Sequence, residues 1–191
     1  MRTGRRTLQV VATRQRRETR PDPTLRVRVL SARATTGWLE WGSLRFRCAL
    51  GRAGRKAIKR EGDGASPIGV WRLRQAWFRA DRLVRPQTGL DLRAIRPRDG
   101  WCDAACDPNY NRPITHPYPA SAEHLWRTDG LYDIVVALGY NDYPRVRGRG
   151  SAIFLHCASE GFAPTQGCIA LARGDLTRLL ARLGRGARVR V

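Results

Sequence analysis

A histidine and a cysteine stand twelve positions apart near the end of this chain, at His156 and Cys168. A cysteine is a strong nucleophile only as its thiolate, and a neighbouring imidazole can accept the thiol proton. These residue types therefore fit acyl transfer, with Cys168 as the nucleophile and His156 as the base. Gly167 allows an unusual backbone conformation or a close approach to substrate. Thr165 offers a hydroxyl that can orient the histidine or a bound carbonyl.

Two short apolar runs must position this pair. Residues 152–155 (AIFL) predict a buried strand that ends at His156, and residues 169–171 (IAL) predict a second strand directly after Cys168. The loop between them contains Gly161 and Pro164. If the two strands lie together, the two side chains become neighbours. Because side chains alternate along a strand, Cys157 is expected on the face opposite His156.

The pattern resembles the YkuD-type L,D-transpeptidase domain, whose signature is a histidine, a spacer and S/T-x-G-C. The matching residues here are His156, Thr165, Gly167 and Cys168. Residues 62–69 (GDGASPIG) are similar to the T-P-x-G segment of that family. The resemblance covers residues 25–191 and is closest to a proteobacterial subgroup, which has counterparts of WCD, YNRP, LYD and YND at 101–103, 110–113, 131–133 and 140–142. The chain departs at Ala170, where many members have an arginine.

The resemblance implies a cysteine L,D-transpeptidase that uses no metal or organic cofactor. Cys168 would attack the carbonyl at the L-centre of diaminopimelate in a peptidoglycan stem peptide, and D-alanine would leave. His156 would accept the thiol proton and then protonate the leaving amine, while the backbone amides of Gly167 and Cys168 would stabilise the oxyanion. An amine on a neighbouring stem would resolve the thioester. Resolution by water would instead give an L,D-carboxypeptidase. The implied location is the periplasm or cell envelope.

Residues 79–126 form a long connection with little periodicity, rich in Pro, Arg, Asp and aromatic residues. Connections of this length are usually functional or have structure of their own. Its side chains can line a groove for an extended substrate, or they can pack down as an irregular surface excursion. The candidates for substrate contact here and in the turn after residue 138 are Trp101, Tyr110, Asn111, His116, Tyr118, Tyr140 and Asn141.

Two other groups of residues compete for a chemical role. A loose imitation of a zinc site combines Cys102, Cys106, His116 and His124. Structural zinc sites usually have tighter spacings and a second close pair of ligands, so no metal is expected. A serine dyad on Ser66 or Ser159 is weaker, because the chain has no G-x-S-x-G motif. Cys102 and Cys106 can also form a disulfide or stay reduced.

The charge of the chain is extreme, with 36 basic and 16 acidic residues and a formal net charge of +20. A nucleic-acid binder would more often gather its charge into a patch with aromatic residues. Here the arginines are scattered along the whole sequence, so nucleic acid is not the expected partner. An anionic wall polymer or membrane surface fits the charge equally well. A basic binding protein with a degenerate catalytic site is therefore the alternative from another functional class.

The expected fold is mainly β: a β-sandwich or curved, barrel-like sheet with one short helix and a long irregular insertion. Alternating apolar residues predict the strands 25–30, 38–50, 68–78 and 131–138. A helix capped by Asp175 is expected over 175–183, followed by an edge strand at 187–191. Residues 1–22 are expected to be a flexible basic extension without the apolar stretch of a signal peptide, and 23–191 a single catalytic domain.

Overall fold

The computed structural model describes residues 24–191, so the basic extension expected over residues 1–22 lies outside the described residues. The chain forms short strands, one helix and one 3-10 turn. In chain order these are β1 (Thr24–Arg28), β2 (Thr36–Trp41), β3 (Leu44–Ala49), β4 (Arg55–Lys56), β5 (Ser66–Pro67), β6 (Val70–Phe78), β7 (Asp91–Ala94), β8 (Asp99–Cys102), β9 (Pro113–Thr115), β10 (Ala122–His124), β11 (Ile134–Leu138), β12 (Phe154–Cys157), η1 (Glu160–Phe162), β13 (Ile169–Leu171), α1 (Arg173–Leu180) and β14 (Arg188–Arg190).

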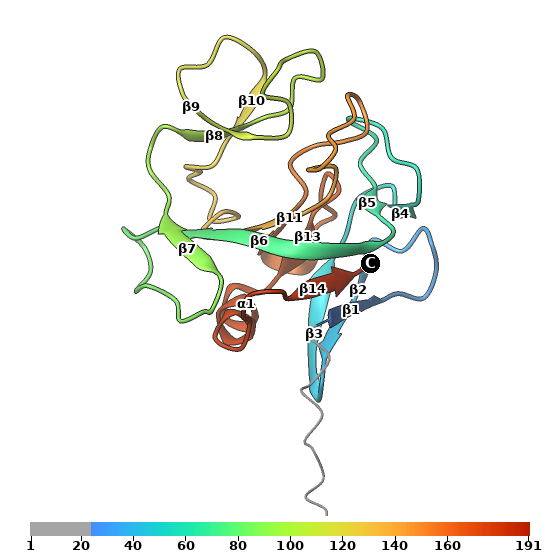
Figure 1. Ribbon diagram of the computed structural model, residues 1–191. Helices are drawn as coiled ribbons and strands as arrows, with labels where there is room; N and C mark the ends of the chain where they lie inside the picture. The colour runs from blue at the N-terminus through green and yellow to red at the C-terminus, as the bar shows by residue number, and fades with distance from the viewer. Residues whose placement is uncertain (1–23) are drawn as a thin grey trace, which may run out of the picture.

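Eight of these strands form one closed, curved sheet (Figure 1). Their order is β11-β12-β13-β3-β2-β1-β14-β6, and a second pairing between β6 and β11 closes the ring. The strand β7 is added beside β6. Most neighbours are antiparallel, but β12 and β13 are parallel, as are β1 and β14. The fold is thus the mainly β, barrel-like sheet that was expected.

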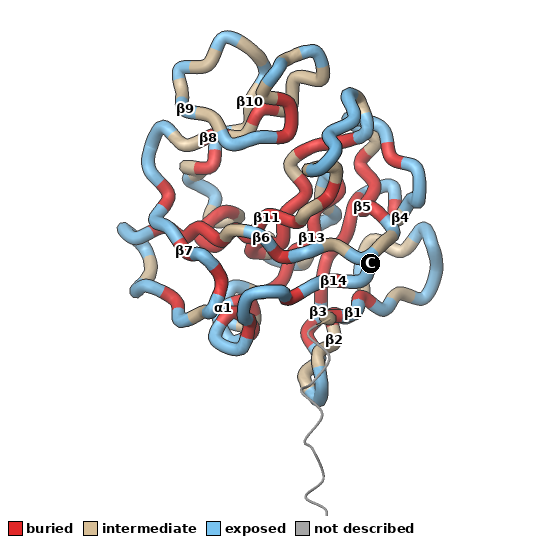
Figure 2. Tube along the Cα trace, in the orientation of Figure 1, coloured by how far each residue is buried: buried red, intermediate tan, exposed pale blue. Residues whose placement is uncertain are grey.

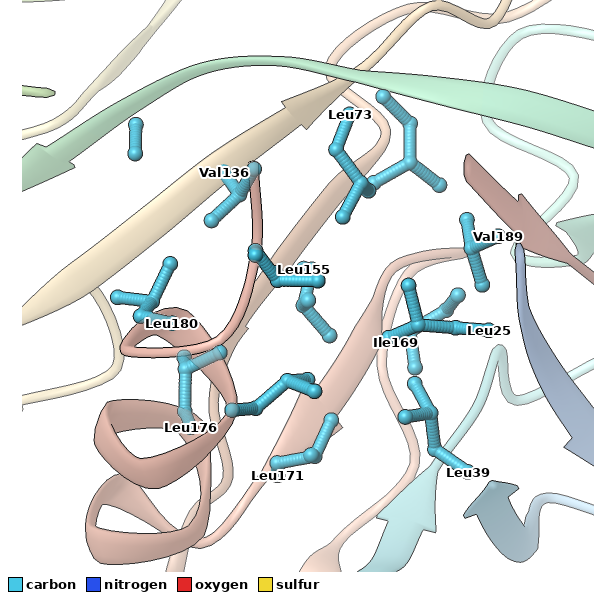
Figure 3. Packing of buried hydrophobic residues seen from close by; sticks show 14 of the residues in the cluster. Leu25, Leu39, Leu73, Val136, Leu155, Ile169, Leu171, Leu176, Leu180 and Val189 are labelled. Atoms are coloured by element: carbon cyan, nitrogen blue, oxygen red, sulfur yellow. The ribbon is translucent and has the colours of Figure 1, made fainter. Parts of the chain in front are cut away.

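The closed sheet surrounds an apolar core, because every second residue of its strands points inward. In β1, for example, Leu25 and Val27 are buried while Arg26 and Arg28 are exposed. The helix α1 packs against this core through one apolar face. Figure 3 shows how the side chains meet, and Figure 2 shows that the buried segments follow the strands while the connecting loops are exposed. Core residues labelled in Figure 3 include Leu25, Leu39, Leu73, Val136, Leu155, Ile169, Leu171, Leu176, Leu180 and Val189.

The long connection after β6 has structure of its own. It contains the three-stranded sheet β10-β8-β9, which lies above the closed sheet in Figure 1. A second apolar cluster joins this insertion to the outer side of the closed sheet: Trp77, Ile95, Leu125, Tyr132, Val135, Ala137, Phe154 and Cys168. The strand β12 therefore has apolar packing on both of its faces.

Two strand predictions were wrong in detail. Residues 38–50 were expected to form one strand, but the chain reverses at Gly42, whose φ is +57°, and forms the antiparallel hairpin β2–β3. The last strand was expected at an edge of the sheet. It lies inside, because β14 pairs with β1 on one side and β6 on the other. The strands predicted at 25–30, 68–78 and 131–138 correspond to β1, β6 and β11.

The helix prediction was shifted. The helix α1 begins at Arg173, two residues before Asp175, and no side chain caps it. Asp175 instead lies in the first turn, where its carboxylate is 3.5 Å from the guanidinium of Arg178. Leu183 lies beyond the end of the helix but is still buried. Within residues 24–191, no helix has the length and apolarity needed to cross a bilayer.

Candidate active site

The parallel strands β12 and β13 place His156 and Cys168 on the same face of the closed sheet. His156 is paired in register with Ala170, two residues past Cys168. Both His156 and Cys168 line a cavity of about 680 Å³ on the outer side of the sheet. Cys157 points the other way, into the enclosed core. The two side chains therefore line one cavity, and Cys157 faces away from it, as the alternation along the strand predicted.

The Cys168 thiol is held by the backbone on two sides. Its Sγ accepts a hydrogen bond from the amide of Phe154 at 3.3 Å and donates one to the carbonyl of Ala152 at 3.3 Å. Ala152 has a φ of +51°, which is uncommon for a residue with a side chain. Burial raises the pKa of Cys168 to about 12. The thiol is therefore protonated at neutral pH and needs a base before it can react.

The His156 ring is held in one orientation and one tautomer. Its Nδ1 lies 2.8 Å from the carbonyl of Cys157, and since a carbonyl can only accept, Nδ1 carries the proton. The neutral ring then has its basic lone pair at Nε2. Burial lowers the pKa of His156 from 6.5 to about 4, so the ring is neutral at pH 7. The hydrogen bonds of the two described side chains run to the backbone and not to each other.

A tyrosine that the sequence reasoning did not assign to the site supports the histidine. The Tyr132 ring packs edge-on against the His156 ring, with the centroids 5.3 Å apart. The Tyr132 hydroxyl donates a hydrogen bond to the carboxylate of Glu123, which also lines the cavity. Burial raises the pKa of Glu123. The imidazole is thus fixed by a carbonyl at Nδ1 and by an aromatic edge at its side.

The segment before the cysteine is shaped by a hydroxyl and a glycine. The Thr165 hydroxyl donates to the carbonyl of Cys168 at 2.7 Å and accepts from the amide of Gly167 at 3.1 Å. The Thr165 hydroxyl therefore orders the loop before the cysteine. One sequence-based expectation was that it would orient the histidine, but its hydrogen bonds go to this loop instead. Gly167 has a φ of +131°, and a Cβ at this position would lie 2.7 Å from the carbonyl oxygen of Ala65. Only glycine fits here without a shift of the backbone.

The Gly-rich segment that resembled the family's T-P-x-G motif lies behind this loop. The Ser66 hydroxyl accepts from the amide of Gly51 at 2.9 Å and donates to the carbonyl of Cys168 at 3.4 Å. The buried Lys59 ammonium donates to the carbonyl of Ala65 at 2.6 Å and pairs with Asp63 at 2.5 Å. Lys59 thereby fixes the wall against which Gly167 packs. Ser66 does not form a serine dyad, because its hydroxyl is hydrogen-bonded to the backbone of Gly51 and Cys168.

The five residues predicted to bind substrate do not line the cavity but lie behind it: Trp101, Tyr110, Asn111, Tyr140 and Asn141. The prediction treated aromatic and amide side chains in an irregular segment as free to meet a ligand. A buried irregular backbone needs polar partners, and these side chains provide them. Tyr110 and Asn111 are only 3% and 4% exposed.

Asn111 is the centre of this supporting network. Its Oδ1 accepts from the amide of Ala152 at 3.1 Å and from the Trp101 indole at 2.9 Å. Its Nδ2 donates to the carbonyls of Tyr140 and Asn141 at 3.0 and 2.8 Å. The same Ala152 accepts the hydrogen bond of the Cys168 thiol. Asn111 therefore positions the backbone that holds the Cys168 thiol.

Tyrosine hydroxyls and a second asparagine continue the network along the cavity wall. The Tyr110 hydroxyl donates to Glu61 and accepts from the amide of Gly150 at 2.9 Å. The Tyr140 hydroxyl donates to the carbonyl of Arg149. The Asn141 amide donates to the carbonyl of Gly150 at 2.9 Å. These contacts fix residues 149–152, which run past the cysteine.

Charged side chains that the sequence reasoning missed line the cavity: Lys59, Glu61, Asp103, Glu123 and Arg127. The Arg127 guanidinium pairs with Asp129 at 2.5 Å and lies 5.1 Å from the centre of the Tyr132 ring. Lys59 had one signal in the sequence, since it is one of only two lysines in an arginine-rich chain. The others had none, because Asp103, Glu123 and Arg127 reach the cavity through the folding of the insertion, and Glu61 through the loop between β4 and β5.

The remaining polar candidates lie away from the nucleophile. The rings of His116 and His124 stack with centroids 3.6 Å apart, and Tyr118 donates to Asp107 at 2.7 Å. Cys102 is buried and Cys106 exposed, both as free thiols. Across residues 24–191 no three His, Cys, Asp or Glu side chains are grouped to hold a metal ion. Ser159 lines the cavity but its hydroxyl accepts from the amide of Ala163 at 3.2 Å.

Comparison with known proteins gives one match. The family model described as the YkuD L,D-transpeptidase catalytic domain matches residues 23–191. No curated protein and no solved structure matches the chain. The match spans the closed sheet, the insertion and both strands that hold the candidate site. The chain therefore belongs to the YkuD family of L,D-transpeptidase catalytic domains.

Proposed function

We propose that this protein is a cysteine L,D-transpeptidase that cross-links peptidoglycan through an acyl-enzyme on Cys168. One observation carries the proposal: a buried thiol and an imidazole with its lone pair at Nε2 line one cavity of a chain of this family. The reaction takes place in the periplasm or cell envelope, where the polymer is located. The partners are a donor stem peptide and an acceptor stem peptide.

The reaction begins with both groups neutral, because burial disfavours the charged form of each. As the Cys168 sulfur bonds to the donor carbonyl carbon, the thiol proton passes to Nε2 of His156. The tetrahedral oxyanion then collapses, the carbon–nitrogen bond breaks, and the imidazolium protonates the departing D-alanine amine. A thioester and free D-alanine remain. An acceptor amine then attacks the thioester and loses its proton to His156. An amide bond forms, the carbon–sulfur bond breaks, and the imidazolium returns the proton to the Cys168 sulfur.

The oxyanion donor differs from the sequence-based expectation. The Gly167 amide already donates to the Thr165 hydroxyl at 3.1 Å, which leaves the Cys168 amide as the candidate of the two. A single well-placed backbone donor is worth about 3 kcal/mol of transition-state stabilisation in acyl-transfer enzymes. The Thr165 hydroxyl also donates to the Cys168 carbonyl at 2.7 Å, so its two hydrogen bonds hold the backbone on either side of this donor.

The charges of the cavity suit a stem peptide, which carries both carboxylates and an amine. Ala170, at the position where many relatives have an arginine, lines the cavity without a charge. Arg127 enters the same cavity from the insertion and supplies a guanidinium for a substrate carboxylate. Glu123 supplies a carboxylate that can receive the acceptor ammonium group. The cavity therefore still has a positive group, Arg127, although position 170 has no arginine.

Intact-mass measurement after incubation with purified stem-containing muropeptides tests the proposal. The wild-type protein and a Cys106→Ala control should both show an acyl adduct and release D-alanine, whereas Cys168→Ala should show neither. Cys106 is the matched control because it is a free, exposed thiol outside the cavity. A cross-linked dimer among the products identifies a transpeptidase, and a trimmed monomer identifies the hydrolytic L,D-carboxypeptidase instead. Binding without adduct or product would favour a binding protein with a degenerate site.

A further inference from the structure

The outer surface of five neighbouring strands, β3-β2-β1-β14-β6, is unusually rich in arginine. Two outward-pointing arginines come from each of β1, β3, β14 and β6, and all eight are exposed. We call this surface the arginine face. Arginines that are scattered in the sequence are thus brought onto neighbouring strands, where the register aligns their alternating positions along the curved outer surface of the closed sheet.

Several of these arginines lie directly opposite one another. Arg26 is paired in register with Arg190, and Arg188 with Arg72. Like charges at opposed positions destabilise a sheet. Glu40 is the single carboxylate in these five strands, all of which are described, and it already forms ion pairs with two arginines at 3.3 and 3.5 Å. Asp142, from outside these strands, pairs with Arg74. The eight arginines of the face still outnumber these two carboxylates, and an anionic partner would stabilise the remaining positive charge.

Composition alone does not account for this imbalance. In the insertion and near it, arginines meet carboxylates from neighbouring loops. Examples are the ion pairs Arg79–Asp81 at 2.7 Å, Arg82–Asp133 at 2.9 Å and Arg127–Asp129 at 2.5 Å. On the arginine face, Arg28 and Arg45 share Glu40, and Arg74 pairs with Asp142. The face therefore differs from these regions in the number of arginines for each carboxylate that pairs with them.

An exposed tryptophan lies within the arginine face. Trp38 is 42% exposed and stands in register between Arg28 on β1 and Arg47 on β3. The Arg45 guanidinium lies 4.4 Å from the centre of its ring. These residues line a hollow of about 330 Å³ together with the fully exposed Leu30. A flat indole can stack on a sugar ring, and the guanidinium groups around it can pair with carboxylates.

The arginine face is continuous with the candidate active site. In register across the sheet, His156 is paired with Ala170, and Ala170 with Ala49 on β3. Arg47 is two residues from Ala49 on the same face, and its guanidinium lies 4.5 Å from the centre of the Phe162 ring. The residues directly after Phe162, at 163–164, line the catalytic cavity. A polymer that enters the cavity can therefore lie along the arginine face as well.

We infer that the arginine face binds a glycan polymer with carboxylate-bearing peptide side chains, next to the segment that reacts in the cavity. The choice of polymer rests on the proposed function, since peptidoglycan has both sugar rings and repeated carboxylates. Three features of the face match it: the excess of guanidinium groups, the exposed indole, and the continuity with the cavity. Many weak contacts along one polymer add up, because each further contact is intramolecular once the first has formed.

Co-sedimentation with purified insoluble peptidoglycan sacculi tests this inference, using Cys168→Ala proteins so that the polymer is not altered. The substitutions Arg28→Gln, Arg188→Gln and Arg190→Gln together should weaken binding about tenfold at low salt, since exposed charge pairs contribute modestly and additively. The control combines Arg96→Gln, Arg147→Gln and Arg182→Gln, which remove the same charge from exposed loops and should leave binding close to that of the parent. Trp38→Ala should weaken binding without any change of charge.

Turnover provides the second readout. With Cys168 restored, the face variant should keep its kcat on small soluble muropeptides but show a raised KM on sacculi. Equal loss of binding in both triple variants would overturn the inference, as would unchanged binding in the face variant. Arginine-dependent binding to phosphatidylglycerol-containing vesicles or to nucleic acid, but not to sacculi, would also overturn it. Arginine-dependent sedimentation without any acyl adduct in the wild type would refute the transpeptidase and leave the binding face standing.

Discussion

The substitution Asn111→Ala separates a supporting role for this residue from a role in substrate binding. The Asn111 side chain makes four hydrogen bonds at 2.8 to 3.1 Å and is 4% exposed. A typical internal hydrogen bond contributes about 1 kcal/mol net, and a buried group left without its partner costs about 1–3 kcal/mol. The free energy of unfolding should therefore fall by about 4 kcal/mol or more.

Urea unfolding followed by tryptophan fluorescence measures this loss, because the Trp101 indole is one of the groups that lose a partner. Any acyl-enzyme formation by the folded variant should be slow at saturating substrate, since the Ala152 backbone that holds the thiol is no longer fixed. Asn109→Ala is the matched control. Asn109 lies in the same insertion, but its side chain donates a hydrogen bond to Tyr118 and not to the cavity wall. An Asn111→Ala protein with unchanged stability and only a raised KM would refute the supporting role.

Three further predictions follow from burial and backbone geometry. Gly167→Ala should lose about 1–3 kcal/mol of stability from backbone strain at φ +131°, in addition to its clash with the Ala65 carbonyl, as measured by urea unfolding. Lys59→Met should lower stability by about 3 kcal/mol as measured by thermal unfolding, because it removes the buried ammonium that pairs with the 11% exposed Asp63 carboxylate at 2.5 Å and leaves only the more distant, exposed Lys56. Stability should fall as the pH decreases from 6.5 to about 4, because His156 takes up a proton in the unfolded chain before it does so in the fold. This pKa difference corresponds to about 3 kcal/mol, measured as the difference between the wild type and His156→Gln.

The two substitutions have matched controls in the chain, and the pH dependence is checked with His156→Gln. Gly174→Ala adds a methyl group where nothing lies within 4 Å, at a glycine without a positive φ, so it should not destabilise the protein. Lys56→Met removes an exposed lysine whose ammonium is 3.8 Å from the Asp63 carboxylate, and should cost much less than Lys59→Met. Equal effects within either pair would contradict the reasoning. A pH dependence that persists unchanged in His156→Gln would rule out His156 as its source.

The sequence was informative where local pattern and burial agree. Alternating apolar residues located the strands, because the inward side of a closed sheet is uniformly apolar. The same alternation put Cys157 on the opposite face from His156, and the apolar runs on either side of the loop brought His156 and Cys168 to one cavity. These predictions needed only the period of a strand.

The sequence was not informative where distant segments meet. The role of β14 depends on pairing with both β1 and β6, which no local pattern encodes. Tyr110 and Asn111 are residue types that often line ligand grooves. Here they accept hydrogen bonds from the backbone amides of Gly150 and Ala152, far along the chain. Glu123 lines the cavity only because the insertion folds over β12. The arginine face was likewise invisible, since its members are spread over four strands of a sheet whose order was unknown.

The pairing of β1 with β14 has a consequence for how this domain is made. Thr24 is aligned with Arg188, so the earliest and latest described strands are neighbours in the sheet. The ring cannot close before β14 has been made, and until then β1 and β6 each present an unpaired edge. Such edges are templates for pairing with other chains, and contacts this distant in sequence form slowly. The unfinished domain is therefore most vulnerable to aggregation before β14 is in place, and the pairing of β14 with β1 and β6 removes the hazard.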